Sequence, residues 1–262
     1  MELDDAYANG AYIDDAAAYP ARWQAEAHAF RTALGERAEI ALPYGPGERH
    51  VLDLFHPVGR HEGTAFFIHG GFWRAFDRSS WSHLAGGLIA RGWSVAMPSY
   101  DLCPEVTIAT ISRQIAQAVR FVAGRTSGPI SITGHSAGGH LSARMTDPAL
   151  IPADVAARFR TILPISPLSD LRPLLRTSMN ADFRMSMADA SAESPLLMRD
   201  RHDARVAVWV GANERPAFLD QARWLAQAWR VPHVIAPGRH HFDVIDLLQD
   251  PGSEMVSTLI AD

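Results

Sequence analysis

Ser136 stands in a setting that could make its hydroxyl a nucleophile. It is the central residue of Gly134-His135-Ser136-Ala137-Gly138, which fits the pattern G-x-S-x-G. A short apolar segment over residues 129–133 predicts a buried strand before the motif, and residues 138–145 predict a helix after it. In a sharp strand-to-helix turn, small flanking glycines let the backbone bend and leave the serine hydroxyl exposed. The spacing therefore predicts a nucleophile elbow, whose chemistry would be attack on a carbonyl carbon.

A serine hydroxyl needs a neighbouring base, and that base needs an acid to orient it. Where this elbow is used, the chain order is serine, then Asp or Glu, then His. The strand predicted over residues 206–210 leads to Glu214, which would lie at the carboxyl edge of a parallel sheet, where ligands bind. The next predicted strand, residues 233–236, leads to His240 and His241, and either imidazole could reach the serine. Glu214 and one of these histidines are therefore predicted to complete the constellation.

Other acids and histidines fit these roles less well. Asp203 precedes its strand and would lie at the opposite edge of the sheet, and Asp220 falls inside a predicted helix as a solvated charge. Asp243 follows the second histidine of the pair by two residues, so Asp243 remains a minor alternative as the orienting acid. His135 is expected to pack within the elbow, and His140 on the helix that follows it.

A second glycine-rich segment could bind the oxyanion that forms when a carbonyl is attacked. His69-Gly70-Gly71 follows an uninterrupted apolar run, residues 64–68, that is typical of a central parallel strand. Loops of the HGG type supply a backbone N–H to an oxyanion hole, and glycine permits the close approach that this requires. The predicted donors are therefore Gly70, Gly71 and the amide of Ala137. His69 itself is expected to brace the loop and not to transfer protons.

The predicted elements place these motifs in one domain, residues 1–262. Strands and helices alternate from residue 64 onward, which predicts an α/β fold of the α/β-hydrolase type with a mostly parallel, doubly wound sheet. A helical arm is expected over about residues 1–35. Residues 168–203 interrupt the alternation and hold four of the eight methionines, so either a small cap over the pocket or ordinary helical packing fits this segment. Also expected are an antiparallel hairpin of strands 38–42 and 51–55, strands over 94–97 and 161–165, and helices over 79–90, 108–123 and 217–229.

Composition limits the classes of partner. The chain has 262 residues, 47% of them hydrophobic, and a net charge of −5 without a basic cluster, so nucleic acid is not an expected partner. The acidic start, residues 1–5, lacks a signal-peptide pattern, and no apolar stretch is long enough to cross a bilayer. Cys103 is the single cysteine and cannot form an intrachain disulfide, as expected in a reducing compartment. We therefore predict a cytoplasmic protein that acts on a small molecule without membrane attachment, and the sequence is compatible with a homodimer.

Motifs for metals and cofactors are absent from the sequence. HExxH does not occur, and the adjacent His240 and His241 could not both face one ion from regular structure. Neither a G-x-G-x-x-G fingerprint nor a Walker loop occurs. We therefore expect chemistry without a metal or a cofactor.

Several segments, taken together and in chain order, carry a resemblance to one known family. They are His69-Gly70-Gly71-Phe72-Trp73, Tyr100-Asp101-Leu102-Cys103-Pro104, the elbow from Gly134 to Leu141, Ser169-Asp170-Leu171-Arg172-Pro173-Leu174 and Glu193-Ser194-Pro195-Leu196. The chain resembles the metal-independent kynurenine formamidases (arylformamidases) of the α/β-hydrolase fold, over roughly residues 44–248. These enzymes hydrolyse the aryl formamide N-formylkynurenine to kynurenine and formate.

The resemblance implies a role for each residue of the constellation. Ser136 would be the nucleophile of an acyl-enzyme mechanism, and His241, the second histidine of the pair, would be the base. The family's acid is normally an Asp in a D-S-P-E-F-like stretch, whereas this chain has Glu214-Arg215-Pro216-Ala217-Phe218. Glutamate can orient an imidazole too, although its extra methylene changes the backbone position that is required.

The substrate side of the site is less constrained by the motifs. A formyl group needs almost no room, so selectivity would lie on the aryl side, where Phe72, Trp73 and Tyr100 are predicted to offer faces for a ring. The same fold and residues would also serve a carboxylesterase or thioesterase of broad acyl specificity. A binding protein that kept only the pocket is disfavoured by the intact Ser, acid and His. An amino-acid head group would favour a nearby cation, for which the candidates are Arg74, Arg172, Arg176 and Arg184.

Overall fold

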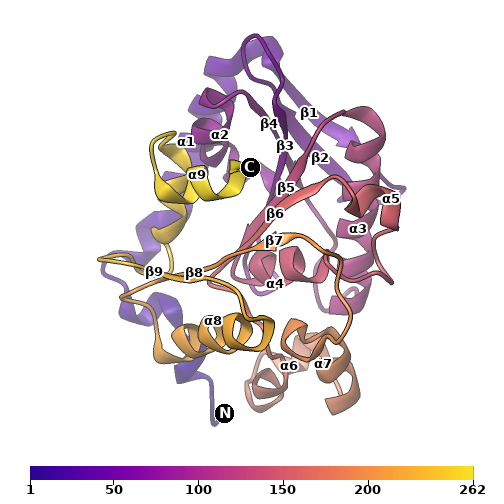
Figure 1. The fold of residues 1–262 in the computed structure, drawn as a ribbon. Coiled ribbons are helices and arrows are strands. Elements are labelled where there is room, and N and C mark those ends of the chain that lie inside the picture. Colours follow the sequence, from indigo (N-terminus) through magenta and orange to yellow (C-terminus); the bar gives the residue numbers. More distant parts are fainter. Residues whose placement is uncertain (262) are drawn as a thin grey trace.

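One mixed sheet organises the fold, with helices packed on both of its faces (Figure 1). The computed structural model describes residues 1–261, and within them nine strands follow the order β1-β2-β4-β3-β5-β6-β8-β9, with β7 paired to β6. β1 and β2 pair antiparallel, as do β2 and β4, while the other pairs are parallel. The predicted hairpin and the mostly parallel sheet are confirmed. The strands are β1 (Ala38–Pro43), β2 (Val51–Phe55), β3 (Gly63–Ile68), β4 (Trp93–Pro98), β5 (Ile130–His135), β6 (Phe159–Ile165), β7 (Arg205–Val206), β8 (Val208–Gly211) and β9 (His233–Ala236).

The apolar run of β3 lies where both faces of the sheet are covered. Phe66 and Ile68 pack into the core on one face, whereas Ala65 and Phe67 pack into the core on the other. Successive side chains of a strand point to opposite faces, so a strand that is buried on both sides needs apolar residues at consecutive positions. This is why the sequence shows an uninterrupted run here and not an alternation.

Two groups of helices enclose the sheet. Helices α3, α4 and α8 supply buried residues to one core, and α1, α2 and α9 supply them to the other (Figure 1). In the described part of the chain, no helix combines the length and the apolar character needed to pass through a bilayer. The helices are α1 (Tyr19–Leu34), α2 (Gly86–Ala90), α3 (Ile108–Arg125), α4 (Ala137–Arg144), α5 (Ala153–Ala156), α6 (Asn180–Phe183), α7 (Met187–Glu193), α8 (Pro216–Trp229) and α9 (Glu254–Ile260).

The prediction of one continuous helix over residues 79–90 was wrong. The chain instead forms two short 3₁₀ turns, Arg78–Ser80 and Ser82–Ala85, before the five-residue helix α2. Glycine and serine are weak helix formers, and Gly87 also lies under the C-terminal part of the chain, where an added Cβ would stand 2.5 Å from the Leu248 carbonyl oxygen. Weak helix propensity and the close approach to that segment together explain why the helix is short.

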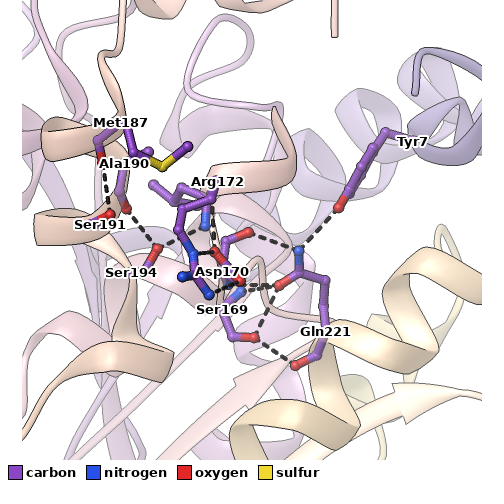
Figure 2. A network of polar contacts seen from close by, with 10 residues as sticks. Tyr7, Ser169, Asp170, Arg172, Met187, Ala190, Ser191, Ser194 and Gln221 are labelled. Atoms are coloured by element: carbon purple, nitrogen blue, oxygen red, sulfur yellow. Dashed lines mark hydrogen bonds and ion pairs between the residues drawn. The ribbon is translucent and has the colours of Figure 1, made fainter. Parts of the chain in front are cut away.

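Residues 168–203, the predicted insertion, run between β6 and β7 as short helical pieces that include α6 and α7. Gln221 of α8 holds the start of this segment, as Figure 2 shows. Its side-chain oxygen accepts the backbone N–H groups of Ser169 (2.8 Å) and Asp170 (2.7 Å), and its side-chain nitrogen donates to the Asp170 carbonyl (2.8 Å) and the Tyr7 hydroxyl (3.1 Å). One buried amide thus ties the insertion, α8 and the N-terminal segment together.

Asp246, in the 3₁₀ helix Val244–Gln249, gives a prediction about stability. Burial raises the pKa of its carboxyl from about 3.8 to about 6. The charge of Arg22, whose Nη2 lies 3.4 Å from Oδ2 of Asp246, opposes this rise only in part. The folded state therefore holds the proton more tightly than the unfolded state, so stability is highest below pH 4 for this group and is lost as the pH rises through 6. We expect Asp246→Asn to remove this loss and to stabilise the protein at pH 7 by about 1–2 kcal/mol, after allowance for solvent screening.

The measurement is urea unfolding of both proteins between pH 4 and pH 8. The matched control is Asp220→Asn, because Asp220 of α8 has a side chain that is 44% exposed and pairs only with the exposed Arg223 of the same helix among residues 1–261. Its stability curve should run parallel to that of the wild type. Parallel curves for Asp246→Asn and the wild type would contradict the prediction.

Candidate active site

Ser136 stands on the turn between β5 and α4. Its backbone has φ 57° and ψ −114°, a strained conformation for a residue with a side chain, and strain of this kind concentrates at functional sites. The Ser136 amide donates to the Ile165 carbonyl of the neighbouring strand at 2.9 Å, which fixes the turn against the sheet. Two residues on, an added Cβ at Gly138 would lie 1.9 Å from the Ile68 carbonyl oxygen. Glycine is thus required for α4 to begin this close to β3.

Glu214 and His241 meet at the carboxyl ends of β8 and β9. Nδ1 of His241 lies 2.6 Å from Oε2 of Glu214, and the carboxylate can only accept, so Nδ1 carries the proton. Oε1 of Glu214 accepts from the Gly211 amide at 2.8 Å and from the Ser166 hydroxyl. The carboxylate is fully buried and has a donor on each oxygen. This arrangement fixes the tautomer of His241 and leaves Nε2 as the free acceptor.

Ser136 and His241 line the same cavity, whose volume is about 1180 Å³. Within residues 1–261, the Ser136 hydroxyl and Nε2 of His241 make no hydrogen bond to each other or to another protein group. Hydrogen bonds of this type are often long in unliganded enzymes and shorten when substrate binds. The ring of His241 is held by its neighbours, with the Phe218 ring centroid at 4.3 Å and that of His135 at 4.5 Å.

His135 itself both packs within the elbow and lines the cavity. Burial, together with the nearby His241, holds the pKa of His135 well below its usual range. His135 is therefore neutral at pH 7 and places no positive charge beside His241.

The glycine loop after β3 lies against the serine. An added Cβ at Gly70 would stand 3.2 Å from Cβ of Ser136, and Gly71 has φ +103°, which favours glycine. Among residues 1–261, the amides of Gly71 and Ala137 donate to no protein acceptor, so both are available to a ligand. The sequence predicts both as oxyanion donors together with Gly70, which also lines the cavity.

His69 and Tyr100 hold this loop from behind. Nδ1 of His69 lies 2.8 Å from the Gly70 carbonyl oxygen, and the two rings stack with centroids 4.3 Å apart. The Tyr100 hydroxyl donates to the His69 carbonyl at 2.9 Å. Burial lowers the pKa of His69 to about 4, so the ring is neutral at pH 7 and braces the loop as expected.

Two of the three residues predicted to face the substrate do not do so. Trp73 and Tyr100 are fully buried and lie outside the cavity wall, whereas Phe72 lines it. Trp73 packs edge-on against His140 and Phe183, and Tyr100 stacks on His69. Both rings pack in the core beneath the loop. A side chain just after a strand can point into the core as readily as into the cavity.

The alternative acid and the other histidines have partners of their own. Asp243 accepts the His240 backbone N–H at 2.7 Å and lies 3.2 Å from its Nδ1, so it serves His240 and not His241. Nε2 of His240 lies 3.0 Å from the Tyr19 hydroxyl. His140 lies with Nε2 2.8 Å from the Glu193 carbonyl, and burial lowers its pKa to about 3.

Some cavity residues were not predicted as such from the sequence. The N-terminal segment contributes part of the wall, including Tyr7, Asn9 and Trp23, and the insertion contributes Met179 and Asp182. These residues lie in or beside separate helical elements far apart in the sequence, whose patterns do not point to a shared pocket, so only the fold brings them here. Of the four candidate arginines, Arg74 lines the cavity and pairs with Asp182, whereas Arg172, Arg176 and Arg184 lie outside its wall.

Cys103 also lines the cavity, but it is not suited to act as a nucleophile. Burial raises the pKa of its thiol to about 11, so it stays protonated at neutral pH. Over residues 1–261, no three His, Cys, Asp or Glu side chains are grouped so that they could hold one metal ion.

Comparison with known proteins identifies the family. Residues 65–231, more than half of the chain, match the model of the alpha/beta hydrolase fold. The chain is 27% identical to kynurenine formamidase of Drosophila melanogaster over 78% of this chain and 75% of that protein, and 26% identical to that of Salmo salar over 87% and 86%.

Among solved structures, a protein from Silicibacter sp. TM1040, provisionally described as a thioesterase, is 60% identical with a TM-score of 0.99 over all of both chains. Esterase B from Lactobacillus rhamnosis, at 18% identity, has the same fold with a TM-score of 0.71 over 95% of this chain and 94% of that one. This chain belongs to the α/β-hydrolase fold family and is a hydrolase.

Proposed function

We propose that this hydrolase cleaves an aryl formamide, N-formylkynurenine, to kynurenine and formate through a serine acyl-enzyme. The observation that carries the mechanism is the cavity that Ser136, His241 and the glycine loop share, with Glu214 holding the imidazole proton on Nδ1. The similarity to kynurenine formamidases over most of their length supports the substrate.

The chemistry follows from the hydrogen bonds of His241. Ser136 Oγ attacks the formyl carbon while Nε2 of His241 takes the hydroxyl proton, and the Gly71 and Ala137 amides donate to the oxyanion. Collapse of the intermediate breaks the C–N bond, and Nε2 returns the proton to the aniline nitrogen. Water then attacks the formyl ester while Nε2 takes one of its protons. The bond between the formyl carbon and Ser136 Oγ breaks, Nε2 returns the proton to Oγ, and formate leaves. Glu214 stabilises the imidazolium at each step.

The size and the aromatic lining of the cavity suit this substrate. A formyl group is too small to fill a cavity of about 1180 Å³, so its walls must recognise the aryl side. Aromatic rings line it, including Phe72, Phe76 and Phe242. These faces could receive the aryl ring.

A direct comparison of two substrates tests the proposal. We expect the purified protein to hydrolyse N-formylkynurenine with a kcat/KM at least as high as that for p-nitrophenyl acetate. The amide is intrinsically the less reactive of the two, so preference for it would require a site built for it. Turnover of the ester without turnover of the formamide would contradict the proposal.

A thioesterase or carboxylesterase is the second candidate, because the 60% identical protein of known structure is provisionally described as a thioesterase. The charges of the cavity weigh against thioesters of polyanionic carriers such as coenzyme A. Asp4, Glu105 and Asp182 line the cavity, and its Arg74 is paired with Asp182. The acidic side chains of this wall outnumber its arginine, and the resulting negative charge repels phosphate groups.

A further inference from the structure

The first residues of the chain form one wall of the reaction cavity. Tyr7, Ala8, Asn9 and Gly10 line it together with Ser136 and His241. The Tyr7 hydroxyl accepts from the buried Gln221 side chain at 3.1 Å, as Figure 2 shows. The Tyr7 ring packs edge-on against Phe218, which also contacts His241. The wall is therefore joined to the elements that hold the imidazole.

An ion pair, a cation–π contact and a hydrogen bond hold the segment on either side of Tyr7. Arg215, next to Glu214, pairs with Asp5 at 2.6 Å, and its guanidinium carbon lies 3.6 Å from the Tyr12 ring centroid. The carboxylate of Asp4 accepts the Ser178 amide at 2.6 Å. Residues 4–12 are thus anchored at both ends, and these contacts hold the residues between the anchors in a defined place.

Asn9 lies between these anchors and is buried. It is only 6% exposed, and its side-chain oxygen has no hydrogen-bond partner within residues 1–261. Asn9 lines the main cavity and also a smaller one of about 180 Å³, and His241 lines both. An unpaired buried acceptor destabilises the free protein, because its lost hydration is not replaced. An acceptor that is buried without a partner, in a cavity that His241 also lines, suggests a ligand that donates a hydrogen bond to it.

We propose that Asn9 is a specificity-determining residue whose side-chain oxygen accepts the N–H of the scissile formamide in the transition state. The inference rests on the proposed function and names the contact that would favour formamides over esters. In this role Asn9 touches the substrate on the leaving-group side, whereas the glycine loop contacts the oxyanion.

The chemistry explains why an amide needs such a group and an ester does not. When the C–N bond breaks, the nitrogen becomes pyramidal, and its new lone pair must point at the proton on Nε2 of His241. The existing N–H is then forced in another direction, and without an acceptor it loses its hydrogen bond to water. An ester oxygen carries no hydrogen, so the same step leaves nothing unpaired. An acceptor beside His241 therefore lowers the barrier for amides selectively.

The test compares 4-nitroformanilide with 4-nitrophenyl formate, which share the acyl and aryl groups and differ in N–H against O. We expect Asn9→Ala and Asn9→Leu to lower kcat/KM for the formanilide by about 10- to 100-fold, the effect of one lost hydrogen bond in a buried site. Turnover of the formate ester, corrected for spontaneous hydrolysis, should change less than about threefold, because the ester makes no such bond. Equal losses on both substrates would overturn the inference.

Thermal unfolding separates this role from a structural one. Leucine matches asparagine in size and removes an unpaired polar atom, so Asn9→Leu should melt at or above the wild-type temperature. A lower melting temperature with parallel losses on both substrates would indicate packing and overturn the inference. Asn180→Ala is the matched control, because both ends of that amide bond to Met185 and it lines neither cavity. It should lower stability and leave the formanilide-to-ester ratio unchanged.

Failure of the proposed function would be visible without any variant. If the wild type hydrolyses neither N-formylkynurenine nor 4-nitroformanilide, the formamidase proposal falls and the role of Asn9 falls with it. If the wild type hydrolyses them and Asn9→Ala keeps the wild-type ratio, only the role of Asn9 is overturned.

Discussion

Ser136→Ala is expected to lower kcat for N-formylkynurenine by about 10⁴-fold or more, to the level left by binding and oxyanion contacts alone. The substitution removes the atom that would bond to the formyl carbon, and within residues 1–261 the thiol of Cys103, with its pKa raised to about 11, is no substitute. Steady-state rates measure the loss, and a fluorophosphonate probe followed by mass spectrometry identifies the modified residue.

Ser142→Ala provides the matched control for this prediction. Ser142 is buried on α4, and its hydroxyl donates to the Gly139 carbonyl at 2.8 Å, outside the cavity wall. Both variants lose one buried hydroxyl from the same turn and helix, but Ser142→Ala should retain turnover and labelling. A wild-type protein that forms no adduct at Ser136, or a Ser136→Ala variant that still turns over, would contradict the serine mechanism.

Glu214→Gln is expected to lower kcat by about 10³- to 10⁴-fold, as a wrongly set histidine tautomer does elsewhere. Both carboxylate oxygens accept: Oε2 from His241, and Oε1 from Gly211 and Ser166. An amide group has one oxygen, so its NH₂ must face a donor on one side. Facing His241, it would force the proton onto Nε2, which could then no longer accept the serine proton. Facing the other side, it would lose the bonds that hold the group in place.

Asp243→Asn is the control, because it alters the other acid near the histidine pair. Asp243 accepts from the His240 backbone at 2.7 Å, and the structure brings it to His240 and not to His241. The variant should keep near-normal turnover. If Asp243→Asn loses activity while Glu214→Gln retains it, the acid is Asp243.

The parts of the site predicted from sequence share one property: each lies just beyond the carboxyl end of a strand. The apolar runs of β3, β5, β8 and β9 determine where those strands end, and parallel pairing brings the ends to one edge. Ser136, Glu214 and His241 could therefore be found from spacing and chain order. Their position did not depend on how any single side chain packs.

The directions of the aromatic side chains could not be read in the same way. Phe72 and Trp73 are adjacent, and both have positive φ, at 49° and 55°. In such an irregular loop there is no alternation from which to infer which ring faces the cavity. The N-terminal wall was missed for a related reason, since its residues are held at the site by contacts with distant parts of the chain, of Tyr7 with α8 and of Asp4 with the insertion.

The wall formed by residues 4–12 separates two tasks within one molecule. The elbow and the glycine loop belong to the span matched by the family model, whereas this segment lies outside it. It also contributes no strand to the sheet. Changes confined to a few residues at the start of the chain can therefore alter which leaving groups fit, while the machinery for attacking a carbonyl stays intact. Substrate range can thus be adjusted from a segment outside the span that carries the nucleophile and the glycine loop.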